Sequence, residues 1–101
     1  MSKVSRESMT AIVNGNYAEL ACTVTDLIED GFLQEAIQMI HYGEPALSSE
    51  ELDKLCDEIK IDTDEDLRKD QHGWYFQGDT GHKTIPHHIA MALLENEEQG
   101  T

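Results

Sequence analysis

Three aspartates alternate in the middle of the chain, with the spacing of the first three ligands of a calcium-binding loop. They are Asp62, Asp64 and Asp66. Such a loop also needs a glycine at its sixth position, where the chain turns sharply, and a bidentate glutamate at its twelfth. Leu67 and Gly73 occupy those positions here, so the loop can neither turn nor complete its ligand set. We therefore interpret the aspartates as an acidic helix turn and predict no calcium site.

Four histidines fall in the last third of the chain, at His72, His82, His87 and His88. Histidine is a common zinc ligand, and a hairpin followed by a helix could bring three of them together. Their spacing matches no known zinc motif, and neighbouring residues on a helix point about 100° apart. We predict no metal ligands and no cofactor. A small metal-binding protein that uses these histidines stays as an alternative function.

Catalytic motifs are not apparent. A nucleophilic serine or cysteine needs a base, an orienting group and an oxyanion site, and nothing in the sequence marks such a set. The turn-like segment 78–81 is not followed by the Gly-Lys-Ser/Thr of a phosphate-binding loop. We therefore predict that the protein is not an enzyme.

The chain has a formal net charge of −14, from 21 acidic and 7 basic residues. A field of this sign repels nucleic acids and anionic membranes and attracts basic protein surfaces. The acids are densest between residues 50 and 70. We predict that a partner-binding face lies there, made of Glu50, Glu51, Asp53, Asp57, Glu58, Asp62, Asp64, Glu65 and Asp66.

Three consecutive aromatic residues, Trp74, Tyr75 and Phe76, lie in the strand-like segment 73–77. Alternate side chains of a strand face opposite sides, so at least one aromatic should stay partly exposed. An exposed aromatic beside acids is typical of a binding hot spot. We therefore add Trp74 and Tyr75 to the predicted partner-binding residues. The alternative is that all three aromatics close the core.

These residues must be positioned by a mainly helical scaffold. Apolar residues at three- and four-residue steps predict two amphipathic helices between Tyr17 and Tyr42, with Asn16 as a cap and a break at Asp30-Gly31. A break of one or two residues forces the helices to pack antiparallel. Segment 31–37 resembles the turn and second helix of a tetratricopeptide-type repeat. The resemblance covers this hairpin only, because no second copy appears at a period near 34 residues.

Shorter elements flank the helical hairpin. A helix that carries Met9, Ile12 and Val13 is predicted before it. After it, the capping box Ser48-Ser49-Glu50-Glu51 predicts a helix to about Lys60. Residues 63–67 predict a further helical turn.

The C-terminal third predicts a change of structure. Segments 73–77 and 82–85 predict two strands around a turn at 78–81. A last helix is predicted over 86–97, with Ile85, Ile89, Ala92 and Leu93 facing inward.

Cys22 and Cys56 fall in separate helical patterns, and we interpret both as buried thiols of a reducing compartment. No apolar signal region or membrane-spanning run is apparent. We therefore expect a cytoplasmic protein.

The predicted fold class is mostly α (α+β): a compact bundle of four to five short helices with a small C-terminal β-hairpin before the last helix, over residues 1–101 as a single acidic helical domain. The predicted function is that of a protein-binding inhibitor or adaptor, which docks an electronegative face on the basic, nucleic-acid-binding surface of another protein, in the sharpest form as a DNA mimic. In size and acidity the chain resembles phage- and plasmid-encoded anti-restriction and anti-CRISPR proteins. A helix-turn-helix-like transcriptional regulator is the other alternative, although no predicted helix has a basic face. Whether the protein forms a homodimer is left open by the sequence.

Overall fold

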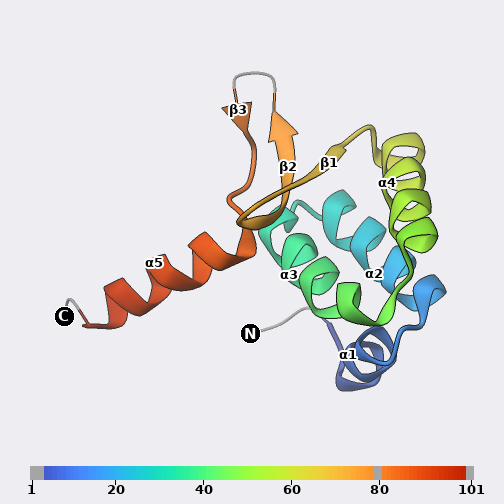
Figure 1. The fold of residues 1–101 in the computed structure, drawn as a ribbon, viewed down its shortest axis with the longest axis horizontal. Helices are drawn as coiled ribbons and strands as arrows, with labels where there is room; N and C mark the ends of the chain where they lie inside the picture. The colour runs from blue at the N-terminus through green and yellow to red at the C-terminus, as the bar shows by residue number, and fades with distance from the viewer. Residues whose placement is uncertain (1–3, 79–80, 100–101) are drawn as a thin grey trace.

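The computed structural model of the protein describes residues 4–78 and 81–99, with the backbone alone at 81, 82 and 96–99. In this part of the chain, four helices come first, then a small antiparallel sheet, and then a last helix (Figure 1). The helical part consists of α1 (Arg6–Val13), α2 (Tyr17–Glu29), α3 (Leu33–Gly43), a 3-10 turn η1 (Glu44–Ala46) and α4 (Ser49–Thr63). The predicted fold class, a helical bundle with a hairpin before the last helix, is confirmed.

Local capping signals explain where the first helices begin and end. The Asn16 side chain accepts a hydrogen bond from the Glu19 N–H at the start of α2. At the start of α4, Ser48 and Glu51 form both hydrogen bonds of the predicted capping box. Gly31 has a φ of +87°, which lets the chain reverse between α2 and α3 as predicted.

The sheet consists of β1 (Asp66–Asp70), β2 (Gly73–Gly78) and the short β3 (Gly81–His82), in that order and antiparallel throughout. The prediction of a helical turn at 63–67 is wrong, because α4 runs on to Thr63 and β1 follows. The left-handed conformation of Asp64, with φ 62°, ends the helix. Leu67 then faces the core opposite Phe76, which only an extended chain allows.

The hairpin also differs from the prediction in its pairing. Its long partner strand is β1, which precedes the aromatic strand. The predicted return strand at 82–85 is wrong in its bounds, because β3 covers only Gly81 and His82. Beyond β3, the Thr84 hydroxyl accepts a hydrogen bond of 2.7 Å from the Phe76 N–H. A side chain therefore satisfies a donor that a longer strand would have paired.

The core lies among the first four helices, and the sheet closes one end of it, because β2 contacts α3 and β1 contacts α4 (Figure 1). Its largest fully buried side chains are Ile12, Leu20, Val24, Ile37, Met39, Ile40, Leu55, Ile59 and Phe76. Gly43 marks the tightest helix contact, because a Cβ there would lie 3.0 Å from both Ile12 and Leu20. α1, α2 and α3 thus approach one another closely through this glycine.

The last helix, α5 (His87–Gln99), leaves this core instead of completing it (Figure 1). The prediction that Ile85 and Leu93 face inward is wrong, since these side chains are 38% and 50% exposed. None of the helices in the described part of the chain combines the length and apolar character of a membrane span.

Candidate functional site

The outer side of α4 carries three acids in one row. Glu50, Asp53 and Asp57 are three and four residues apart, so they share a helix face over about 10 Å of axial rise. All three are exposed. The described residues supply no ion-pair partner to any of them. We call these three residues the outer row.

A second set of predicted acids lies on the flank of α4 that faces α2. Glu58 and Asp62 border a shallow groove of about 200 Å³ between the two helices, with the buried Leu55 and Ile59 among its lining residues. Asp26, on α2, adds a carboxylate to this groove. We had not predicted Asp26, because the contact between α2 and α4 is not visible in the sequence.

The flank acids also perform structural roles. The Tyr17 hydroxyl donates a hydrogen bond of 2.7 Å to Glu58. Burial of the phenol, followed by this hydrogen bond and the negative charge of Glu58, raises the pKa of Tyr17 well above its usual value. Glu51 accepts the capping hydrogen bond from the Ser48 N–H. These two carboxylates therefore already have partners within the molecule.

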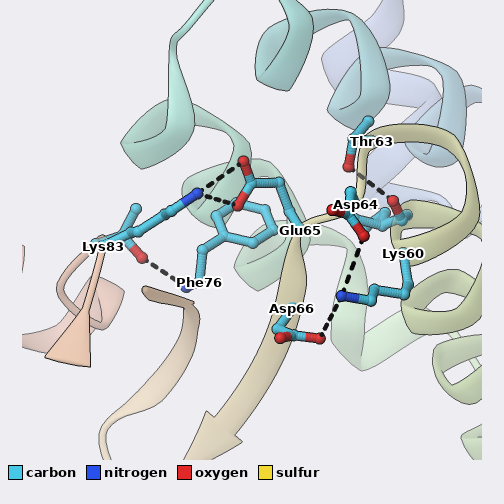
Figure 2. Close-up of polar contacts among 9 residues, drawn as sticks. Lys60, Thr63, Asp64, Glu65, Asp66, Phe76 and Lys83 are labelled. Atoms are coloured by element: carbon cyan, nitrogen blue, oxygen red, sulfur yellow. Dashed lines mark hydrogen bonds and ion pairs between the residues drawn. The ribbon is translucent and has the colours of Figure 1, made fainter. Parts of the chain in front are cut away.

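The last three acids of the predicted face are largely neutralised by lysines (Figure 2). Lys60 Nζ lies 3.3 Å from a carboxylate oxygen of Asp64 and 3.3 Å from one of Asp66. These contacts raise the pKa of Lys60. Lys83 Nζ donates to both carboxylate oxygens of Glu65, at 2.8 and 3.1 Å. This end of the predicted face is an ion-pair network that joins α4 to the sheet.

The same ion-pair network includes two of the three aspartates that have the spacing of calcium ligands. Asp64 and Asp66 both contact the cation of Lys60, and Asp64 serves as the left-handed cap of α4. Among the described side chains, at residues 4–78 and 83–95, no three from histidine, cysteine, aspartate or glutamate are grouped as a metal site requires.

Ile61 is an apolar residue on the outer side of α4 that we had not predicted as part of a site. It is 81% exposed and lies one helical turn beyond Asp57. A helical wheel shows the signal, because Ile61 falls off the stripe formed by Leu55 and Ile59. The outer row is thus continued by one exposed apolar side chain, which is a common composition for a binding surface.

The aromatic strand does not contribute an exposed binding surface. Trp74, Tyr75 and Phe76 are 6%, 9% and 0% exposed, so the expectation that at least one stays partly exposed is wrong. Trp74 and Phe76 belong to the core cluster, and Lys69 Nζ lies 5.4 Å from the centre of the Trp74 ring. All three aromatics are therefore buried, Trp74 and Phe76 in the core cluster and Tyr75 on the opposite face of β2.

The C-terminal histidines form pairs, not the group of three we considered. His87 is buried and stacks on His41 of α3 with ring centroids 4.3 Å apart, while the rings of His72 and His88 are 6.2 Å apart. Burial, and then the neighbouring His41 and His88, lower the pKa of His87. The side chain of His82 lies outside the described residues. The histidines thus place the first turn of α5 against α3 and against the turn between β1 and β2.

Both cysteines are free thiols. Cys22 is exposed on α2, so the prediction that it is buried is wrong, whereas Cys56 is partly buried against the core. Burial, and then the carboxylates of Asp53 and Asp57, raise the pKa of Cys56. A raised pKa disfavours the thiolate, which is the reactive form of cysteine.

Comparison of the chain with models of known protein families, with curated proteins and with solved structures gave no match. The functional argument therefore depends on the geometry and charge described above.

Proposed function

We propose that the protein is a small binding protein, an inhibitor or adaptor, that docks the outer row of α4 on a basic surface of a partner protein. The observation that carries the proposal is the division of the acids on and after α4. Glu50, Asp53 and Asp57 have no ion-pair partner among the described residues, whereas the acids at 64–66 contact lysines of the same molecule.

The distribution of lysines supports this choice of face. The chain has five lysines, and Lys54, Lys60, Lys69 and Lys83 each lie within ion-pair distance of a carboxylate of the same molecule. Few cations are left to balance the outer row. An uncompensated row of charge attracts an oppositely charged surface, speeds the encounter, and loses this advantage as salt screens it.

A nucleic-acid-binding groove is the basic surface that suits this row best. Its carboxylates follow one another along the helix at rises of about 4.5 and 6 Å, so they form a line of negative charge as a strand of phosphates does. In the sharpest form of the proposal, the row replaces such phosphates in the groove of a nuclease or another nucleic-acid-binding protein. Ile61 would supply an apolar contact at the end of the row.

The proposal places the protein among non-catalytic cytoplasmic inhibitors of the kind that phages and plasmids encode. Its own charge opposes direct binding to nucleic acid or to anionic membranes.

The proposal is tested with two triple variants of equal charge change. Glu50→Gln/Asp53→Asn/Asp57→Asn neutralises the outer row, and Asp64→Asn/Glu65→Gln/Asp66→Asn neutralises the ion-paired acids. Each variant and the wild type are immobilised and exposed to a cytoplasmic extract. A protein retained at low salt and released at high salt is then purified, and its affinity is measured by calorimetry.

We expect the outer-row variant to bind the retained protein about tenfold more weakly, a loss of about 1.4 kcal/mol. The control variant should bind within a factor of about two of wild type, because its acids are already paired. Equal losses in both variants would refute the assignment to the outer row. Affinity that is insensitive to salt and to both variants would refute the electrostatic proposal itself.

A further inference from the structure

The middle of α5 presents apolar side chains to solvent. Residues 89–94 are all apolar, and Met91, Leu93 and Leu94 are 41%, 50% and 53% exposed. At 100° per residue, these three exposed positions span about 160° of the helix circumference. A helix of this kind normally packs against another surface, since a contiguous exposed apolar patch marks an interaction site.

The body of the protein covers only the start of this helix. The Gln34 side chain accepts a hydrogen bond from the Ile85 N–H and donates one to the Ile85 carbonyl, at 3.1 and 2.6 Å. His87 stacks on His41 and meets Tyr42 edge-on, with ring centroids 5.6 Å apart in the second contact. These contacts hold α5 so that its later turns point away from the core (Figure 1).

The low negative charge of α5 and the segment before it favours a second copy of the chain as the surface that packs on α5. Residues 80–94 form the longest stretch of the chain without an acidic residue. α5 also lies at the opposite end of the longest axis from α4 (Figure 1). Two copies that meet through α5 thus bring together their least negative surfaces and keep their acidic faces far apart. A basic partner would find no carboxylate on the exposed apolar turns.

We infer that α5 is a self-association surface, on which the α5 helix of a second copy packs antiparallel. The first turn of α5 carries His88 and the positive end of the helix dipole, and acids begin at Glu95. An antiparallel pair places each acidic end beside the opposite end of the other helix, which a parallel pair does not. The contact is isologous, as in most homodimers.

The length of α5 limits the size of the contact between the two copies. A helix of 13 residues gives a seam of about 20 Å, so the interface is short and the dimer should dissociate in the micromolar range. The two outer rows then lie at the far ends of the dimer. Such an arrangement allows bivalent binding to a partner with repeated basic sites. The inference does not depend on the proposed function.

Sedimentation velocity of the full chain tests the inference, from about 5 to 500 µM protein at low and high salt. The wild type should shift from monomer to dimer over this range. Leu93→Asp/Leu94→Asp should weaken the dimer at least tenfold, whereas Val13→Asp, on α1, should leave it unchanged. Val13 is a control for the effect of an aspartate at a half-exposed apolar position, because it is 52% exposed. Circular dichroism verifies that each variant is folded.

Salt separates this inference from the proposed function. High salt should strengthen the dimer, because it screens repulsion between two chains of charge −14, whereas it should weaken partner binding through α4. A wild type that stays monomeric at 500 µM in high salt overturns the inference. A dimer that the double aspartate variant does not weaken overturns the assignment to α5.

Cysteine cross-linking tests the antiparallel orientation, in a background with Cys22→Ser and Cys56→Ser. Ala90→Cys and Leu94→Cys, both on the apolar side of α5, are made as two single-cysteine variants. Mixed together and oxidised, they should form a covalent heterodimer, while either variant alone should cross-link poorly. Efficient cross-linking of each variant with itself would show a parallel pair and overturn the antiparallel arrangement.

Discussion

The two ends of the molecule are built from amphipathic helices that expose opposite kinds of surface. α4 buries Leu55 and Ile59 completely against α2 and presents acids to solvent, whereas α5 leaves Leu93 and Leu94 half exposed. Both helices have apolar residues at helical spacing. The difference shows that such spacing predicts an apolar face but does not tell whether that face packs on the same molecule.

The cause of the difference is the place at which each helix joins the fold. α4 follows η1 and returns along α2, so its inward face packs on α2 and on β1. α5 begins after β3, on the other side of the sheet hairpin, and only its first turn reaches α3 and β2. Most of α5 therefore has no core beside it.

The largest expected difference between α4 and α5 is in the stability that their apolar side chains contribute. Ile59→Ala opens a cavity in a fully packed site and should lower the free energy of unfolding by about 2–5 kcal/mol. Leu93→Ala removes a half-exposed side chain and should lower it by less than about 0.5 kcal/mol. Urea unfolding at low micromolar protein, where α5 is unpaired, measures both values. Similar losses in the two variants would show that α5 packs on the core after all.

A smaller effect concerns the way in which α4 begins. Ser48→Ala removes the side chain that caps the Glu51 N–H and should cost about 1 kcal/mol of stability. Ser49→Ala, one residue later, is the control, because Ser49 is exposed and its hydroxyl makes no hydrogen bond within the described residues. Thermal unfolding of the two variants compares them. If Ser49→Ala proves as costly, the capping box does not define this helix start.

The smallest expected effect is the pH dependence of the α5 anchor. The pKa of His87 lies below its ordinary value of 6.5, so the folded protein binds this proton less readily than the unfolded chain. Stability from this site is complete above pH 6.5 and falls as the pH is lowered through the pKa of the folded state. The groups that face His87 are His41, Tyr42 and His88.

Amide hydrogen exchange at Ile89 and Ala90 measures this effect, because both N–H groups bond to the Pro86 carbonyl in the first turn of α5. Protection, corrected for intrinsic rates, should decrease between pH 7.5 and pH 5.5. His87→Phe keeps an aromatic ring at the site without a titrating group, so its protection should change less. An equal change in both proteins would mean that His87 is not the responsible group.

Some features could be predicted from the sequence because the signals for them are local. Asn16 and the Ser48–Glu51 capping box lie within one helical turn of the backbone groups that they satisfy, and Gly31 needs no distant contact to adopt a positive φ. The first four helices, and a row of acids on the fourth, follow from such signals and from helical spacing. The predicted end of α4 at about Lys60 is three residues early, because the helix runs to Thr63 and is ended by Asp64 in a left-handed conformation.

Other features depend on contacts between residues far apart in the chain, and these contacts could not be predicted from the sequence. β1 is a strand because Leu67 meets Phe76 across the hairpin, although the charge around it favoured a helical turn. The division of the acids depends on lysines brought from elsewhere, such as Lys83 to Glu65. The exposure of α5 depends on the position in the fold at which the chain leaves β3. Short-range signals thus specify the helices, whereas tertiary packing decides which of their charges and apolar faces remain available for binding.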